Sequence, residues 1–134
     1  MKMKTFADIP ATHLHLLDAR DDIAYLMAGF DVYALPSAGE SFPNVVGEAM
    51  ASGVSCVVTD VGDCAQIVGD TGKVVRAGDM RQFATEIIGL LSLSATARKQ
   101  LGKQARKRIQ TNYSLELCAY QYREIYRGAI VQRR

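Results

Sequence analysis

Two glutamates, Glu40 and Glu48, stand eight positions apart in the segment E-S-F-P-N-V-V-G-E. An ionised carboxylate only accepts hydrogen bonds, so a pair of them suits a ligand that offers hydroxyl groups. A glycoside hydrolase also uses two carboxyl groups, but it needs them about 5 to 9.5 Å apart across a cleft. Eight helical steps would separate the two glutamates by about 12 Å along one axis, which argues against hydrolysis.

The residues around this pair predict a strand, a loop, a helix and a second strand. Residues 32–35 form a short apolar run with β-forming side chains, and turn-forming residues follow it. Pro43 suits the first turn of a helix, because its missing N–H costs nothing there. Apolar residues then recur at helical spacing until Gly53 ends the helix, and residues 56–59 predict the next strand.

The start of the predicted helix is a candidate anion site. A helix N-terminus offers free backbone N–H groups and the positive end of a dipole, and phosphates bind at such places. Glu40 lies in the loop just before this terminus, and Glu48 lies about one turn inside the helix. Carboxylates on both sides of an amide-lined anion site would suit hydroxyls at both ends of a ligand. A nucleotide sugar has this layout.

The longer stretch P-S-x-x-E-S-F-P-N-V-V-G-E-A-M-A-S-G-V-S-C-V-V-T-D-V-G-D resembles the signature of family-4 glycosyltransferases of the GT-B type. The glutamate pair matches that family's E-x7-E motif, and the resemblance extends over about residues 14–131. It implies that Glu40, the candidate catalytic residue, contacts the donor hexose. It further implies that Glu48 binds the ribose and that the sugar is transferred with retention of configuration. The residues of the motif are similar to those of bacterial enzymes that build surface polysaccharides.

The same resemblance implies which backbone groups contact the donor phosphates. These are the amides of Phe42, Asn44 and Val45, since Pro43 has no amide hydrogen. Ser41 belongs to the same donor-binding loop and stands where the family more often has glycine. A lone pair of glutamates at this spacing arises by chance in many helices, so the assignment depends on the strand, turn and glycine pattern around it.

The remainder of the chain continues the alternation of strands and helices. Residues 14–17 and 73–76 predict further strands, and residues 21–29 predict a short helix. Helices capped by Asp79, Ser94 and Ser114 follow, and the apolar and aromatic face of the last one is expected in the core. The inward stripe predicted for the helix after Asp79 consists of Met80, Phe83, Ala84, Ile87 and Leu91. The chain is therefore predicted to be α/β, with a Rossmann-like parallel sheet, flanking helices and C-terminal helices.

About four strands are predicted, fewer than the five or six of a complete doubly wound domain. By resemblance, residues 1–134 are a single, partial C-terminal domain of the GT-B type that binds the donor. The first strand–helix units and the N-terminal acceptor domain would be missing. We therefore expect the isolated chain to bind a nucleotide-diphosphate sugar without transferring the sugar.

Composition indicates one soluble globular domain. The chain has 134 residues, of which 49% are hydrophobic and 22% charged. The sequence after the initial M-K-M-K lacks the apolar stretch of a signal peptide, and no uncharged apolar run approaches about 18 residues. These features predict a cytoplasmic protein.

The cysteines and histidines do not predict a metal site. Cys56, Cys64 and Cys118 lack metal-binding spacing and are expected to be reduced thiols, with Cys56 in a strand, Cys64 in a loop and Cys118 on a helix. His13 and His15 share one face of a predicted strand, but no third ligand is evident nearby. No D-x-D occurs either, in agreement with the metal independence that the resemblance implies. We expect no metal and no other cofactor.

Charge is distributed unevenly along the chain. Residues 1–97 hold 6 Lys/Arg against 12 Asp/Glu, whereas residues 98–134 hold 10 against 2. Six of the basic residues lie on or beside the polar face of one predicted helix: Arg98, Lys99, Lys103, Arg106, Lys107 and Arg108. A solvated helix face is the ordinary interpretation, and contact with an anionic membrane surface is the sharper one. No motif indicates nucleic-acid binding.

Some alternatives remain open at this point. Arg20, just beyond the first predicted strand, is a candidate for a contact near the nucleotide base. A nucleotide-sugar epimerase of related architecture is a rival enzyme. A non-catalytic module that binds nucleotide sugars is the rival outside enzymes.

Overall fold

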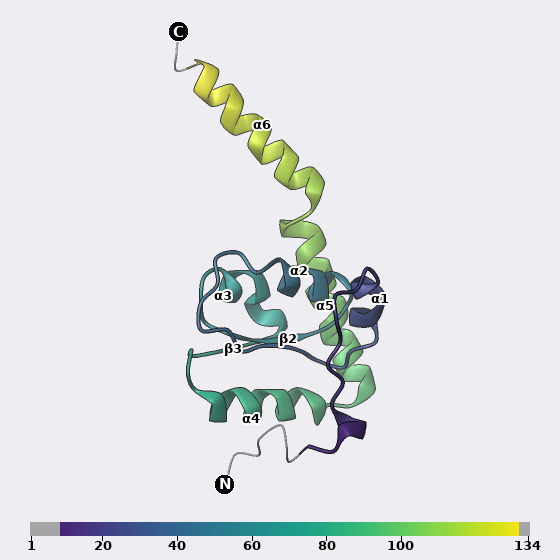
Figure 1. Ribbon diagram of the computed structural model, residues 1–134. Coiled ribbons are helices and arrows are strands. Elements are labelled where there is room, and N and C mark those ends of the chain that lie inside the picture. Colours follow the sequence, from purple (N-terminus) through teal and green to yellow (C-terminus); the bar gives the residue numbers. More distant parts are fainter. Residues whose placement is uncertain (1–8, 132–134) are drawn as a thin grey trace.

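The computed structural model describes residues 9–131, and a parallel three-stranded sheet lies at its centre (Figure 1). The strands are β1 (Tyr33–Leu35), β2 (Cys56–Thr59) and β3 (Lys73–Val75), and they lie side by side in chain order. Tyr33 pairs with Cys56, and Val57 pairs with Lys73. Because neighbouring parallel strands need a crossover, a helix connects each strand to the next.

Helices cover both faces of the sheet. The crossover helices α2 (Asn44–Ala51) and α3 (Cys64–Val68) lie on one face together with α1 (Ile23–Ala28), and α4 (Met80–Leu91) lies on the other (Figure 1). The long helix α5 (Ala95–Asn112) packs mainly against α2, and α6 (Leu115–Val131) extends away from the body (Figure 1). Two short 3-10 helices, η2 (Ala11–His13) and η3 (Gly69–Thr71), complete the described elements.

The core is built around β2, all four residues of which are buried. Side chains alternate between the two faces of a strand. Cys56 and Val58 pack with α1, α2, α3 and α5, whereas Val57 packs with Phe83 and Leu90 of α4. A strand that is apolar on both sides is typical of the centre of a parallel sheet. The predicted strand at residues 56–59 is confirmed with its bounds.

The predicted helix caps are confirmed. The Asp79 side chain accepts a hydrogen bond from the Gln82 N–H at 2.9 Å, and the Ser94 hydroxyl accepts one from the Ala97 N–H at 3.2 Å. The Ser114 hydroxyl accepts one from the Leu117 N–H, also at 3.2 Å. Each cap satisfies a backbone donor that the first turn of a helix leaves without a partner.

Residues 14–17 were expected as a strand, and this prediction is wrong. They lie outside the sheet, with Leu16 and Leu17 82% and 54% exposed, so the described residues form three strands. An extended segment becomes a strand only by pairing its backbone with a neighbour, and apolar sequence alone does not supply one. His13 consequently ends η2 and does not share a strand face with His15.

Two smaller predictions also need correction. Cys64 is not in a loop, because it is the first residue of α3 and is fully buried. In α4, Met80 and Leu91 are about half exposed, and Leu90 is buried beside Phe83.

The apolar face of α6 is exposed, contrary to the prediction that it belongs to the core. Leu115, Tyr122 and Tyr126 are 82%, 63% and 66% exposed. An amphipathic helix needs an apolar partner surface, and in the described part of the chain the helices α1 to α5 already cover the sheet. The pattern predicted the helix correctly but not its environment.

Candidate functional site

The predicted site lies at the carboxyl edge of the parallel strands, where ligands bind in open α/β sheets. The loop after β1 carries Glu40 and leads into α2, which carries Glu48 in its second turn. Both glutamates are exposed, whereas Pro43 between them is buried. The two carboxylates are therefore open to a ligand, and the loop between them is anchored in the body.

A short chain of hydrogen bonds holds Glu40 in place. The Ser37 hydroxyl donates to Glu40 Oε1 at 2.6 Å, and the Thr59 hydroxyl donates to the Ser37 carbonyl oxygen at 2.6 Å. Thr59 is the last residue of β2 and is only 1% exposed. The carboxylate at the surface is thus connected through Ser37 to the core of the sheet.

The loop after β2 packs against the backbone of Glu40 and Ser41. Gly62 has a φ of +51°, and a β-carbon on it would stand 2.4 Å from the carbonyl oxygens of both Glu40 and Ser41. The Asp63 N–H donates to the Ser41 carbonyl oxygen at 3.0 Å. Only glycine accommodates both this φ and this approach. Sequence reasoning assigned Gly62 no role, although it belongs to the V-G-D stretch that carried the resemblance.

The N-terminus of α2 offers backbone amides as expected. Pro43 is the N-cap and not part of the first turn, so Asn44 and Val45 are the first two helical residues. The N–H groups at these positions have no partner within a helix, and they lie at the positive end of its dipole. No acidic residue occupies the first turn of α2. This terminus can bind an anion.

Both glutamates contribute, after burial and Cys56, to the raised pKa of Tyr33. Burial raises the pKa of the Tyr33 hydroxyl, and the negative forms of Cys56, Glu48 and Glu40 add to the increase. Both carboxylates therefore act on the same side chain at the start of β1. Glu40 also contributes, after burial, to the raised pKa of Cys64.

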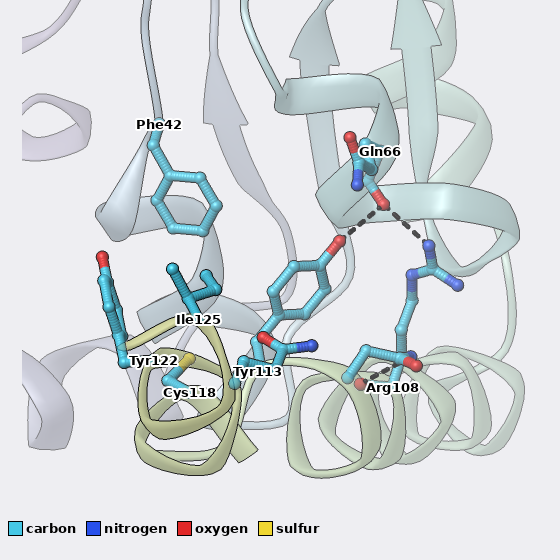
Figure 2. Close-up of a pocket in the computed structure, with 9 residues that line it drawn as sticks. Phe42, Gln66, Arg108, Tyr113, Cys118, Tyr122 and Ile125 are labelled. Atoms are coloured by element: carbon cyan, nitrogen blue, oxygen red, sulfur yellow. Dashed lines mark hydrogen bonds between the residues drawn. The ribbon is translucent and has the colours of Figure 1, made fainter. Parts of the chain in front are cut away.

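Two cavities meet at the donor loop, which we define as residues 40–45. Glu48, Asn44 and Phe42 line a cavity of about 390 Å³. Beside it lies a groove of about 770 Å³ between the donor loop, α3 and α6 (Figure 2). Phe42, Tyr113 and Cys118 line both. The site thus reaches the junction of α5 and α6, which the sequence did not reveal.

A family model described as "Glycosyl transferases group 1" matches residues 2–93 of the sequence. This chain belongs to that glycosyltransferase family. The resemblance inferred from the glutamate-containing stretch is confirmed at the level of the family.

Curated relatives and solved structures agree with this assignment. N-acetyl-alpha-D-glucosaminyl L-malate synthase of Bacillus anthracis is 36% identical over 112 residues, which are 82% of this chain and 29% of that protein. N,N'-diacetylbacillosaminyl-diphospho-undecaprenol alpha-1,3-N-acetylgalactosaminyltransferase of Campylobacter jejuni is 32% identical over 118 residues, 84% of this chain and 30% of that protein.

Among solved structures, sucrose-phosphate synthase of Thermosynechococcus elongatus matches with a TM-score of 0.75 at 29% identity. The match covers 82% of this chain and 28% of that GT-B chain. The predicted fold class, an α/β parallel sheet with flanking helices, is confirmed. The glycosyltransferase chain spans less than a third of the length of these three proteins.

In this glycosyltransferase Arg20 forms an ion pair with Asp22. Its guanidinium Nε donates to the Asp22 carboxylate at 2.6 Å, and this contact raises the pKa of Arg20 and lowers the pKa of Asp22. Arg20 lines neither of the two cavities at the donor loop, and neither does Glu40. Of the predicted site residues, Phe42, Asn44 and Glu48 line these cavities.

Two further findings concern residues 9–131. No group of three or more His, Cys, Asp or Glu side chains in this part of the chain is arranged to hold a metal ion. Its helices also include none that is long and apolar enough to cross a membrane.

Proposed function

We propose that this chain is the donor-binding part of a glycosyltransferase that moves a sugar from a nucleotide-diphosphate sugar to an acceptor hydroxyl with retention of configuration. The observation that carries the proposal is the start of α2. Backbone amides at this helix start lie between Glu40 and Glu48 in the chain. The Glu40 carboxylate accepts a hydrogen bond from the Ser37 hydroxyl. The proposed role is in building bacterial surface polysaccharides, and the Campylobacter relative, whose name gives a diphospho-undecaprenol substrate, supports it.

In this mechanism the departing diphosphate gathers negative charge as the bond to the sugar breaks. The amides of Phe42, Asn44 and Val45 stabilise that charge more in the transition state than in the ground state. Glu40 orients the hexose and Glu48 binds the ribose hydroxyls. Ser41 and the buried Pro43 fix the path of the donor loop, because the Ser41 carbonyl lies against Gly62.

Residues 1–134 would form a single, partial donor-binding domain. β1 pairs with β2 on one side, and its other edge would take the missing strands. The greater length of the relatives supports an additional acceptor domain in the parent enzyme. The reaction would take place between the two domains, in the cytoplasm and without a metal or other cofactor. Arg20 would contact the region of the base only after leaving Asp22.

Peripheral contact with an anionic membrane is a second part of the proposal. Lys99, Lys103, Arg106 and Lys107 recur at i, i+4, i+7 and i+8 on one face of α5, and all four are exposed. α5 contains no acidic residue. Basic side chains on one surface favour an anionic leaflet, each by about 1 kcal/mol. The Campylobacter relative acts on a diphospho-undecaprenol compound, which supports a lipid-linked acceptor here.

Two of the six predicted basic residues do not belong to this face. Arg98 forms an ion pair with Asp31 at 3.1 Å, and Arg108 donates to carbonyl oxygens at the end of α3. The basic face is therefore limited to the four residues named above. No described feature supports nucleic-acid binding as the use of these charges.

The proposal is tested by calorimetry of the purified chain with UDP, GDP and ADP in turn. We expect weak, salt-sensitive binding of at least one of them, and no sugar transfer by the chain alone. Absence of binding for all three would contradict the donor-binding role, and transfer by the isolated chain would contradict its incompleteness. Binding of the nucleotide by a full-length parent that shows no transfer would favour the non-catalytic module. Sugar conversion without an acceptor would favour the epimerase.

A further inference from the structure

We infer that Tyr113 is a positioning residue for the donor loop, acting through the ring of Phe42. The two rings lie with their centroids 6.2 Å apart and their planes inclined at 57°. Aromatic pairs prefer such tilted arrangements over face-to-face stacking. The residues are 71 positions apart in the sequence, so the contact fastens the loop after β1 to the end of α5.

Tyr113 is itself held by the end of α3. Its hydroxyl donates to the Gln66 carbonyl oxygen at 3.1 Å, and the Arg108 guanidinium donates to the same oxygen at 2.7 Å (Figure 2). Arg108 also donates to the Ile67 carbonyl oxygen at 2.9 Å. Carbonyls at the end of a helix have no partner within it, so both side chains satisfy acceptors that need one.

Gly69 leaves space for the Arg108 guanidinium at the end of α3. A β-carbon at this position would stand 2.5 Å from the central carbon of the Arg108 guanidinium, and Gly69 has a φ of +56°. Arg108 can therefore lie flat against the chain at the end of α3. Tyr113 and Arg108 are thus fixed by the same short turn.

Tyr113 also marks the place where α5 ends. Its N–H donates to the Ile109 carbonyl oxygen at 2.9 Å, and the neighbouring Ser114 caps α6. The residue consequently connects α3, α5, the start of α6 and the donor loop. Phe42 is 49% exposed, and among the described residues the Tyr113 ring is its aromatic partner.

The consequence for function rests on the proposed donor site: Tyr113 orders the loop amides before the diphosphate binds. A loop that is ordered before binding loses less conformational entropy when the ligand binds. Replacement of Tyr113 by leucine should therefore weaken nucleoside diphosphate binding about three- to tenfold, the range that corresponds to an aromatic pair.

The primary test measures loop order in the chain without ligand, by ¹⁵N relaxation of the Phe42 and Asn44 amides. In the parent chain we expect order parameters of about 0.85, and in Tyr113→Leu values below about 0.6. Tyr113→Phe keeps the ring but loses the hydrogen bond to Gln66, and its order parameters should fall between those of the parent and Tyr113→Leu. Tyr120→Leu is the matched control, because Tyr120 is 57% exposed on α6 and lies outside the groove.

If Tyr113 served stability alone, Tyr113→Leu would melt at a lower temperature, but its loop amides would stay ordered at temperatures well below unfolding. Unchanged order parameters in the folded Tyr113→Leu chain would overturn the inference. If that variant fails to fold, Phe42→Leu breaks the same contact at an exposed position and must loosen the Asn44 amide. Calorimetry adds a separate result: a parent chain that binds no nucleoside diphosphate contradicts the proposed function, while the order parameters still decide the role of Tyr113.

Discussion

Gly62 lies directly against the backbone of Glu40, since a β-carbon on Gly62 would stand 2.4 Å from the Glu40 carbonyl oxygen. The loop after β2 therefore limits how closely the loop that carries the candidate catalytic carboxylate can approach the sheet edge. The contact joins two crossover connections at the same edge of the sheet, so the position of Glu40 depends on residues on both.

Gly62→Ala should destabilise the chain, because alanine at a φ of +51° is strained and its methyl group meets backbone that cannot move aside. We expect a loss of about 1–3 kcal/mol from the backbone strain alone, visible as a lower melting temperature in circular dichroism. Gly89→Ala is the control. Gly89 lies inside α4 with open space at the β-carbon position, and alanine there should stabilise the helix by about 0.5–1 kcal/mol. Equal melting temperatures for Gly62→Ala and the parent would show that the two loops are not packed as described.

The two glutamates should have separable effects on binding. Glu48→Ala should weaken binding of a nucleoside diphosphate that lacks the sugar, since Glu48 is proposed to bind ribose. Glu40→Ala should leave that binding unchanged and weaken only the nucleotide sugar. Ser37→Ala should act like a milder Glu40→Ala, because it removes the 2.6 Å hydrogen bond that holds the carboxylate. Calorimetry with both ligands measures the difference, and equal losses in the Glu40 and Glu48 variants would contradict the assignment of roles.

The basic face of α5 should make the chain bind anionic vesicles in a salt-sensitive way and leave neutral vesicles unbound. The double variant Lys103→Glu and Lys107→Glu should lose this binding in a sedimentation assay. Arg76→Glu with Arg81→Glu makes the same change of net charge at exposed positions outside α5 and should retain most of it. If both double variants sediment like the parent, the face is merely solvated.

Thiol reactivity should distinguish the three cysteines in the folded chain. Burial raises the pKa of Cys56 to about 12, and its side chain is 1% exposed. Since only the thiolate reacts and a raised pKa favours the thiol, Cys56 should stay unmodified by iodoacetamide at pH 8. Cys64 is fully buried with a raised pKa and should also be protected, whereas the partly exposed Cys118 should react first. Mass spectrometry of the labelled peptides gives the order in which the cysteines react, and early labelling of Cys56 would contradict its placement in the core.

Local features of the fold could be predicted from the sequence. The strand β2 follows from an uninterrupted apolar run, and the caps at Asp79, Ser94 and Ser114 follow from side chains that bond to amides three residues ahead. The places of Glu40 in the loop before α2 and of Glu48 inside α2 also followed from the local sequence, whereas their roles in donor binding stay a prediction.

Features that depend on distant partners could not be predicted. Residues 14–17 have the composition of a strand but no strand beside them in the described chain, and the apolar face of α6 has the pattern of a core helix but no surface to cover. The contact of Phe42 with Tyr113 joins two segments whose local patterns are independent of each other. The support of Glu40 by Ser37 and Gly62 likewise required the packing of two loops.

The central claim, that the N-terminus of α2 binds the donor diphosphate, is tested most directly by deleting a single amide hydrogen. Asn44 is the first residue of α2, a position at which helices tolerate proline, so Asn44→Pro should remove one N–H and keep the helix. Asn44→Ala keeps the N–H and removes the same side chain. Since a hydrogen bond to a charged group contributes about 1.5–3 kcal/mol, calorimetry should show nucleoside diphosphate affinity at least about tenfold lower for the proline variant than for the alanine variant. Equal affinities in two folded variants would contradict the donor site described here.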